Sequence, residues 1–475
     1  MKNVYTGLVI LALLAGSQPL GSRGEPGYLF GSATAAQAAQ DPLSMDDPAR
    51  GDATPQGHVF RIPSEDSAET QGDAIGMADA AVYSVAPEIP MPAAREEADL
   101  FAQVAPDPYL EMEDGVLIRS SLPYLQAVKD RLDQAMAAER MVGMAVAVIE
   151  NGEPVLVYTG GETAAGTGEP VTTRTLFRAA SVSKTFAGAL LAHLEAEGRL
   201  DLDEIAEDVT VKSTQRPTLI ELVSHRTGLP NNAYDNRIEE ANLSVAEIRG
   251  MLAGVDLICP VGGCYSYQNV AFSGLEHAVE RATGLDYRDA VRSFLFNQYG
   301  LHRAGFGEED LTRADSWARP HRGWSRTTST PGNPASTYDV MPSAASVVLS
   351  LEDMIAWAQA FLREGEGVPH ELRERIFTPH TSTPRETNSL QRRYPGRVSE
   401  THYGMGWRIY QWGDRTLVAH SGYLGGFGAN IVLEPESGFG FVALWNADTS
   451  APWRLWPTVM DLRTGDGPGD WLDDL

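Results

Sequence analysis

The pattern of apolar positions predicts an ordered region that starts near residue 122. In LPYLQAVKDRLDQAMAAERM, apolar side chains recur every three or four residues, which is typical of one face of a helix. The positions are Leu122, Leu125, Val128, Leu132 and Met136. Two apolar runs then flank Asn151-Gly152, a dipeptide that favours the tight turn of a β-hairpin. The region therefore opens with a predicted helix and a predicted hairpin.

The middle of the chain is predicted to be mostly helical. Apolar side chains at helical spacing run from Val182 to Leu194, and Gly198 ends that pattern. Further helices are expected at 219–224, 244–253, 270–283, 287–296 and 350–365. The segment 304–336 is rich in Pro, Gly, Ser and Thr, so we expect long loops there, of the kind that often line a binding cleft.

Short apolar runs separated by turn residues return near the C-terminus. They predict strands in GMGWRIYQW, TLVAHSG, GANIVLEP and GFGFVALWNA, followed by a last helix at 453–462. Strands come early and late, with helices between them. The simplest arrangement is one antiparallel sheet built from both ends of the domain and packed beside a helical region. The predicted fold class is therefore α+β.

The segments outside this domain differ from it in composition. MKNVYTGLVILALLAGSQP has a charged start and a short apolar core, which is typical of an export signal and too short to span a bilayer. We assign residues 1–38 to this signal and leader, with an uncleaved anchor as the alternative. Residues 39–114 form a predicted acidic, Ala/Pro-rich linker with too little apolar surface to order itself. The predicted folded domain then occupies 115–465, and an acidic tail occupies 466–475.

Charge narrows the possible partners. The formal net charge is −27, and 17 acidic against 3 basic residues between Asp41 and Asp114 account for −14 of it. Such a chain lacks the basic surface that nucleic acids and anionic membranes require. We expect a periplasmic or extracellular protein with no stable membrane span after signal cleavage, and leave its oligomeric state open.

Two cysteines, Cys259 and Cys264, lie in CPVGGC. In an exported chain they could form a small disulfide loop, with two free thiols as the alternative. A metal site is not expected, because zinc usually takes four ligands and no histidine lies close to this pair in the sequence.

Candidate chemistry begins with SVSK, where Ser181 precedes Lys184 by three residues at the start of a predicted helix. This spacing puts both side chains on one face of the helix. A serine hydroxyl needs a base, and a lysine amine can serve when burial or a nearby cation lowers its pKa. Lysine occurs only at Lys2, Lys129, Lys184 and Lys212, which favours a role for this one. The alternative is a helix-capping serine beside a solvated lysine.

Two later motifs add polar groups. In YQN, Tyr267 could exchange protons with a nearby lysine and Asn269 could hold a substrate amide. In HSGYLGGFG, which contains His420, Gly422 would let a substrate backbone approach an edge strand, and the N–H of Tyr423 could face a carbonyl oxygen. Each motif alone is explained better by ordinary packing, a helix cap or a turn.

A further histidine, His225, lies in LVSHRTGLP and suggests a serine–histidine triad. The chain has no G-x-S-x-G elbow to supply the nucleophile of an α/β-hydrolase. We therefore predict a structural role for this segment, as a helix end and turn.

In this order, SVSK, LVSHRTGLP, YQN and HSG resemble the penicillin-recognising serine hydrolases. The resemblance is to the branch that holds class C β-lactamases, D-Ala-D-Ala carboxypeptidases and related esterases. It covers about 122–462, and DYRDAVRSFLFNQYGL, SLEDMIAWAQAF and YGMGW also resemble stretches of that branch. It implies a β-lactamase/transpeptidase-like fold, with an antiparallel sheet from both chain ends, flanking helices and an all-helical region.

The resemblance implies a role for each residue. Ser181 would be the acylated nucleophile, and Lys184 its partner in proton transfer. Tyr267 would be the acid/base group, acting first in acylation and then on the hydrolytic water. Asn269 would bind the amide of the substrate. The N–H groups of Ser181 and Tyr423 would form the oxyanion hole.

The chain departs from the family pattern in the third motif. His420-Ser421-Gly422 stands where many members have Lys-Thr-Gly or Lys-Ser-Gly. The family's lysine helps to hold a substrate carboxylate, whereas His420 is mostly neutral at pH 7 unless its pKa is shifted. Esters, amides and peptides are therefore favoured over carboxylated β-lactams. Gln268, between Tyr267 and Asn269, is also larger than expected.

The sequence therefore predicts an exported serine hydrolase that forms an acyl-enzyme on Ser181, without a metal or cofactor. Its substrate would be a small molecule or peptide with an ester, amide, peptide or β-lactam carbonyl. The alternative is a penicillin-binding or sensing protein of the same fold that does not turn over. The presence of Ser181, Lys184 and Tyr267 together argues against a complete loss of chemistry. A cell-envelope scaffold that uses the acidic linker is a third hypothesis.

Overall fold

The structure, a computed structural model, describes residues 109, 112–239, 243–323, 325–326, 330–467 and 471–472. The predicted export signal at 1–38 and nearly all of the predicted linker at 39–114 lie outside the described residues. Within the described part of the chain, no helix is both long and apolar enough to cross a bilayer.

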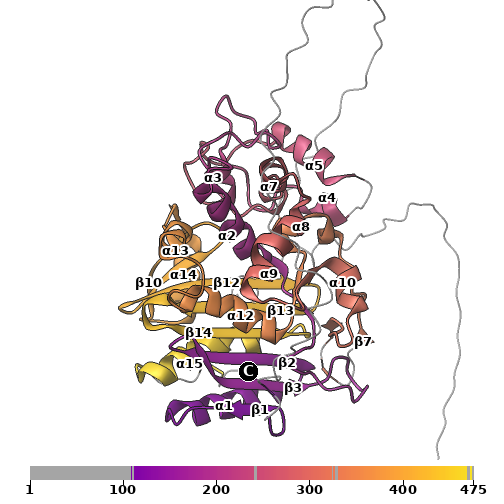
Figure 1. Ribbon diagram of the computed structural model, residues 1–475, viewed down its shortest axis with the longest axis vertical. Coiled ribbons are helices and arrows are strands. Elements are labelled where there is room, and N and C mark those ends of the chain that lie inside the picture. The colour runs from indigo at the N-terminus through magenta and orange to yellow at the C-terminus, as the bar shows by residue number, and fades with distance from the viewer. Residues whose placement is uncertain are drawn as a thin grey trace, which may run out of the picture.

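Nine antiparallel strands form the central sheet, and strands from both ends of the chain meet inside it (Figure 1). In spatial order they are β1 (Val116–Ile118), β3 (Glu153–Gly161), β2 (Gly143–Glu150), β14 (Phe439–Trp445), β13 (Phe427–Glu434), β12 (Arg415–Leu424), β11 (Arg408–Trp412), β10 (Val398–Tyr403) and β9 (Thr381–Ser382). The two ends join where β2 pairs with β14, with Ala147 opposite Val442. The prediction of one antiparallel sheet from both chain ends is confirmed.

The predicted hairpin at Asn151-Gly152 is also confirmed. These two residues connect β2 to β3, and both have positive φ, 52° and 75°. A two-residue turn of this kind matches the twist of the strands that it joins, and it needs residues that tolerate a left-handed backbone. The sequence therefore encodes this hairpin locally.

Alternate side chains of the sheet belong to two separate hydrophobic cores, as the two-residue period of a strand requires. On β2, Ala147 packs into one core, while its neighbours Val146 and Val148 pack into the other. We call the side of Ala147 the helical face and the side of Val146 the back face.

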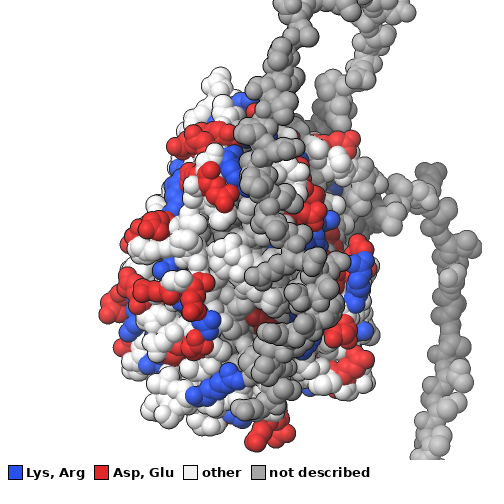
Figure 2. All heavy atoms as spheres, viewed as in Figure 1, with Lys and Arg blue, Asp and Glu red and all other residues white. Residues whose placement is uncertain are grey.

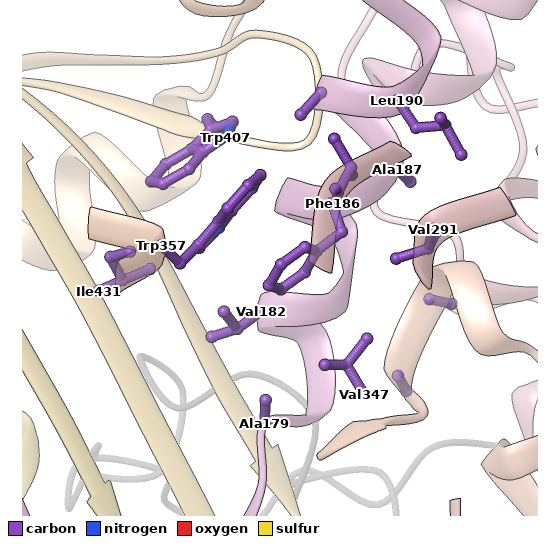
Figure 3. Close-up of a cluster of buried hydrophobic side chains, with 14 of the residues drawn as sticks. Ala179, Val182, Phe186, Ala187, Leu190, Val291, Val347, Trp357, Trp407 and Ile431 are labelled. Atoms are coloured by element: carbon purple, nitrogen blue, oxygen red, sulfur yellow. The ribbon is translucent and has the colours of Figure 1, made fainter. Parts of the chain in front are cut away.

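The helical face is covered by α2 (Ser183–Ala196) and α12 (Leu351–Leu362), both at or near their predicted positions. Phe186 of α2 stacks on Trp357 of α12 with 4.2 Å between ring centroids, close to Trp407 (Figure 3). The other helices of this side are α3 (Leu219–Val223), α4 (Asp235–Glu239), α5 (Val245–Met251), α6 (Asn269–Phe272), α7 (Leu275–Thr283), α8 (Tyr287–Val291), α9 (Asn297–Tyr299), α10 (Gly307–Arg313), α11 (Pro342–Ala345) and α13 (His370–Phe377).

The back face is covered by α1 (Tyr124–Met136), α15 (Leu455–Thr464) and α14 (Pro384–Arg393). Its core is rich in aromatic rings: Trp445 lies 4.5 Å from Trp453, and Trp412 lies 4.8 Å from Trp456, between ring centroids. Leu472, in the segment predicted as an acidic tail, is buried in this core. The core of the back face is thus mainly aromatic and aliphatic.

Short strands complete the fold beside the main sheet. A three-stranded sheet has the order β4 (Phe177–Arg178), β8 (Val347–Leu349) and β5 (Gly305–Phe306), and β6 (His321–Arg322) pairs with β7 (Thr330–Pro331). β4 lies shortly before α2 in the sequence, and its pairing with β8 helps to fix where the chain enters that helix.

Two helical predictions need correction. The helix expected at 270–283 is split into α6 and α7 around Gly274, where an added Cβ would lie 2.4 Å from Val209 Cγ2. The expectation of loops throughout 304–336 is wrong at 307–313, which form α10. Three acidic residues, 308–310, occupy the first turn of α10 and favour the positive end of the helix dipole.

The two cysteines form a disulfide between Cys259 and Cys264, as one of the two alternatives predicted. The bridge closes a small loop shortly before Tyr267.

On the face drawn in Figure 2, the described acidic side chains lie in small groups with basic ones among them, which is typical of a solvated surface.

Candidate active site

Ser181 lies in a tight turn between β4 and α2. The turn passes through Ala180, a non-glycine residue with a φ of 47°, and Ser181 then lies in the 3₁₀ turn Ala180–Val182. Ala180 and Val182 are buried while Ser181 is partly exposed, so the turn presents the serine hydroxyl outward. A left-handed φ at alanine stores strain, and such strain is commonly retained at functional sites.

The third motif lies directly beside this turn. Residues 415–419 of β12 pair with β11, whereas residues 420–424 of β12 extend past the end of β11. On the opposite edge of β12, these last residues pair with β13. A Cβ on Gly422 would lie 2.1 Å from Ala179 O and 3.1 Å from Ser181 N. The close approach predicted for Gly422 is therefore to the chain's own backbone, and it brings the Ser181 amide up against this edge of β12.

Lys184 is fully buried on the first turn of α2. Its Nζ lies 3.4 Å from Ser181 Oγ, 2.7 Å from Asn269 Oδ1 and 2.8 Å from the carbonyl oxygen of Ala344. Burial lowers the pKa of Lys184 well below its usual value; the nearby carboxylate of Asp235 raises it, and the guanidinium of Arg408 lowers it further. Because desolvation dominates, the amine favours its neutral form and can accept a proton.

Tyr267 packs against the same amine. Lys184 Nζ lies 4.7 Å from the centroid of the Tyr267 ring, and the Arg408 guanidinium carbon lies 5.7 Å from it. The structure thus brings together Ser181, Lys184 and Tyr267, which come from two separate parts of the sequence. A phenol between an amine that can take up a proton and a guanidinium is in a setting where a tyrosine can exchange protons.

Asn269 begins α6 and lies next to Lys184, away from any exposed surface. Its Oδ1 accepts from Lys184 Nζ, and its Nδ2 donates to Asp235 Oδ2 at 2.7 Å. The sequence suggested a substrate-binding role for Asn269. The structure shows that Asn269 also bridges Lys184 to an acidic residue that the sequence did not single out.

His420 is buried and has a hydrogen-bond partner at each ring nitrogen. Nε2 lies 3.1 Å from Tyr403 Oη, and Nδ1 lies 2.9 Å from Ser421 O. Burial, and then the charges of Arg408 and Lys184, lower the pKa of His420 well below its usual value. The imidazole is therefore neutral, with Nδ1–H donating to Ser421 and the Tyr403 hydroxyl donating to Nε2. It cannot act as the cation that a lysine would supply at this position.

The side chains next to His420 on β12 point to the back face. The Ser421 hydroxyl donates to Asn430 Oδ1 at 2.8 Å, and Tyr423 packs in the back-face core. Only the backbone of Tyr423 therefore remains available to the site, and the expected contact of its N–H with a substrate carbonyl stays a prediction.

Arg408 is a site residue that the sequence analysis missed. It lies on β11, opposite Ala419, and forms a buried ion pair with Glu386, which also accepts from the hydroxyl of Tyr410 at 2.8 Å. Its charge depresses the pKa of His420, Lys184 and His225. An arginine directly after the apolar YGMGW stretch was the signal available in the sequence.

His225 has the structural position predicted for it. It adopts a φ of 57°, and its Nδ1 accepts from the backbone N–H of Gln268 at 3.2 Å. Its ring lies 4.3 Å from that of Tyr267, between centroids, and burial lowers its pKa well below the usual value. A neutral His225 thus supports the ring of Tyr267 from behind, and Gln268 turns inward and is buried.

Among the residues that the structure describes, no group of three or more His, Cys, Asp or Glu side chains is arranged to hold a metal ion. The polar groups at the site are a hydroxyl, an amine, a phenol, amides, neutral imidazoles, the guanidinium of Arg408 and the carboxylate of Asp235. This set suits proton transfer and nucleophilic attack on a carbonyl carbon.

Comparisons with known proteins show what the chain as a whole is similar to. Residues 128–463 match the beta-lactamase family. Penicillin-binding protein 4 of Amycolatopsis lactamdurans is 25% identical over 321 residues, which cover 65% of this chain and 82% of that protein. A D-aminopeptidase of Gluconobacter oxydans (strain 621H) is 24% identical over 315 residues, 65% of this chain and 56% of the relative. The chain thus spans little more than half of that aminopeptidase.

The fold is shared with solved structures. The octameric penicillin-binding protein homologue from Pyrococcus abyssi superposes with a TM-score of 0.64 at 20% sequence identity, covering 72% of this chain and 78% of that one. At this identity the likeness establishes the fold, and the site has to be argued from its own geometry.

Proposed function

The chain belongs to the beta-lactamase family, and from this premise we propose that it is an exported serine hydrolase that forms an acyl-enzyme on Ser181. The observation that carries the proposal is the buried amine of Lys184, 3.4 Å from the Ser181 hydroxyl. A buried lysine of lowered pKa beside a partly exposed serine is a base paired with a nucleophile.

Acylation follows from these positions. Neutral Lys184 takes the proton of Ser181 as Oγ bonds to the substrate carbonyl carbon and the carbonyl π electrons move onto oxygen. The N–H groups of Ser181 and Tyr423 would stabilise that oxyanion. The bond to the leaving group then breaks, and the hydroxyl of Tyr267 gives the leaving group its proton.

Hydrolysis regenerates the enzyme. The Tyr267 phenolate takes a proton from a water molecule as the water oxygen attacks the acyl carbon. The ester bond to Ser181 breaks, and the protonated Lys184 returns its proton to Oγ. Protons and electrons balance over the two steps, and the net reaction is the addition of water across one acyl bond.

We propose esters, amides or peptides without a carboxylate at the position that the family's lysine would hold. Neutral His420 offers no charge there, and the guanidinium of Arg408 is paired with Glu386. The similarity to a D-aminopeptidase supports peptides with an N-terminal D-residue as one candidate class.

Export is supported by the apolar N-terminal segment and by the Cys259–Cys264 disulfide. Disulfides persist mainly in oxidising compartments outside the cytosol. We therefore propose that the protein acts in the periplasm or outside the cell.

A second candidate is a penicillin-binding protein that acylates without turnover, which the similarity to Penicillin-binding protein 4 supports. Both candidates require Ser181 as the nucleophile, so they differ only after acylation. A burst of product without a steady rate would identify the second candidate, and continuous turnover would identify the hydrolase.

The proposal is tested by covalent labelling and turnover together. The wild-type protein should react with a fluorophosphonate or fluorescent penicillin probe, and Ser181→Ala should not. Label that persists on Ser181→Ala would remove Ser181 from this role. Nitrocefin, a p-nitrophenyl ester and a D-alanyl peptide should then rank the substrate classes, with the ester or the peptide turned over faster than nitrocefin.

A further inference from the structure

The neutral amine of Lys184 has only two N–H donors and one lone pair, so its orientation decides whether it can act as a base. Two of its neighbours, Asn269 Oδ1 at 2.7 Å and the carbonyl oxygen of Ala344 at 2.8 Å, can only accept. When both N–H groups point to these oxygens, the lone pair remains for the third neighbour. That neighbour is the Ser181 hydroxyl at 3.4 Å.

This arrangement depends on which end of the Asn269 amide faces Lys184. The oxygen and nitrogen of an asparagine amide are nearly identical in shape, so hydrogen-bond partners set its orientation. Asp235, as a carboxylate, can only accept, and its Oδ2 lies 2.7 Å from Asn269 Nδ2. Asp235 therefore holds the nitrogen on its own side and leaves Oδ1 facing Lys184.

We propose that Asp235 is a positioning residue for the reaction: it fixes the Asn269 amide so that Lys184 directs its lone pair at Ser181. This rests on the proposed function, because it assigns a task within the same acylation step. The hydrogen bonds described above connect Asp235 to Lys184 through Asn269, whose Nδ2 donates to Asp235 and whose Oδ1 accepts from Lys184.

The surroundings hold Asp235 in place for this task. It is buried at the first position of α4, after a turn in which Asn232 and Tyr234 have φ values of 50° and 63°. Its backbone N–H donates to Asn232 O at 3.1 Å, and the hydroxyl of Tyr338 donates to its Oδ2 at 3.4 Å. The carboxylate is thus held from two elements, a strained turn and the 3₁₀ turn Thr337–Val340.

Asp235 also contributes charge, which gives the proposal a signature beyond rate. Its carboxylate favours the protonated form of Lys184, in opposition to burial and Arg408. The other titratable groups near the amine are Tyr267, His225 and His420, and both imidazoles are kept neutral by burial. Removal of the Asp235 charge should therefore lower the pKa of Lys184. In a plot of acylation rate against pH, the rise on the acidic side, here called the acid limb, should then move to lower pH.

The test compares Asp235→Asn with the wild type in pre-steady-state acylation by a p-nitrophenyl ester. The new amide can present either end to Asn269, so the orientation is no longer fixed. We expect acylation at the plateau pH to slow about tenfold to 100-fold, the scale of a misplaced base, with KM little changed. A wild-type rate with an unmoved acid limb would overturn the proposal.

A matched control separates positioning from general damage. Asp461 is a buried carboxylate of the back face, hydrogen-bonded to Arg397 and Trp471. Asp461→Asn should lower thermal stability without a change in the acid limb. If Asp461→Asn moved the limb as far as Asp235→Asn does, the shift would come from stability and the proposal would fail.

A double-mutant cycle tests the route through Asn269. In an Asn269→Ala background, Asp235→Asn should cost no further plateau rate, because the amide that Asp235 orients is gone. Equal rate losses in both backgrounds would contradict the proposal. This outcome is distinct from a failure of the proposed function, in which Ser181→Ala would keep its covalent label.

Discussion

The two faces of the central sheet use burial in opposite ways. On the back face, burial packs aromatic rings, as in the Trp445–Trp453 pair. On the helical face, the same degree of burial is imposed on ionisable groups, above all Lys184 and His420. On the back face, burial supports stability. Beside Ser181, burial lowers the pKa of the Lys184 amine, which the proposed mechanism uses as its base.

One strand shows the contrast within consecutive residues. On β12, Gly422 faces the Ser181 turn and His420 contacts Tyr403, while Ser421 and Tyr423 point to the back face. The two-residue period of a strand keeps the two environments separate although they lie one residue apart. Substitutions on the two sides should therefore separate chemistry from stability.

The largest expected effect falls on the helical face. Lys184→Ala and Tyr267→Phe should each lower kcat by about 100-fold or more, the usual scale for lost proton transfer. Steady-state kinetics checks this, with exposed Lys129→Ala as the control that keeps wild-type activity. A Lys184→Ala enzyme that kept near-wild-type turnover would break the comparison, because burial of this amine would then serve no chemistry.

The next effect belongs to the back face and should be one of stability. Trp453→Ala removes a ring that packs on Trp445 and should cost about 3–5 kcal/mol of unfolding free energy. The folded fraction should keep its kcat. Urea unfolding with activity assays in parallel would measure both, and a kcat that fell in proportion to stability would show that the two faces are coupled.

A third prediction concerns pH. Burial raises the pKa of Glu276, which accepts from the backbone N–H and hydroxyl of Ser343, to about 7. At a pH below the ordinary pKa of about 4.5, the carboxyl is protonated in both the folded and the unfolded state and costs no stability. As pH rises from there through 7, the unfolded chain loses the proton more readily, and the free energy of unfolding falls. Between pH 5 and 8 this should cost up to about 3 kcal/mol of unfolding free energy.

The matched variant for this prediction is Glu276→Gln, which keeps an acceptor for Ser343 but cannot ionise. Denaturant unfolding at several pH values should show a flatter profile for the variant than for the wild type. If the two profiles ran parallel, the charge of Glu276 would not be the cause of the pH dependence.

The smallest expected effect is that of the disulfide. Replacement of both Cys259 and Cys264 by serine should cost about 2 kcal/mol of unfolding free energy, because the closed loop is short. Turnover at low temperature should be retained. If turnover fell under conditions where the variant is still fully folded, the loop would position Tyr267 directly.

The parts of the fold that depend on local pattern could be predicted from the sequence. The hairpin at Asn151-Gly152, the start of α2 and the late strands follow from spacing and turn residues alone. The split at Gly274 lies where the chain packs closely on Val209, which is 65 positions away in the sequence, and spacing alone does not indicate that contact.

The same limit applies to the site. Ser181, Lys184 and Tyr267 could be proposed from short motifs, and the structure places them together. Asp235 could not, since its segment has no motif of its own, and Arg408 was missed because nothing in the neighbouring YGMGW stretch indicates that this side chain reaches the site. Their tasks depend on contacts between distant parts of the chain, which spacing does not encode.

The central claim is that burial keeps the amine of Lys184 neutral beside Ser181, and NMR titration of the lysine side chains tests it most directly. With four lysines in the chain, a protein labelled with ¹³C at the lysine Cε should give few signals, and Lys184→Met identifies one of them. The account predicts that this signal titrates far below the ordinary lysine pKa of about 10.4, while Lys129 does not. A Lys184 signal that titrated at the ordinary value would contradict the account.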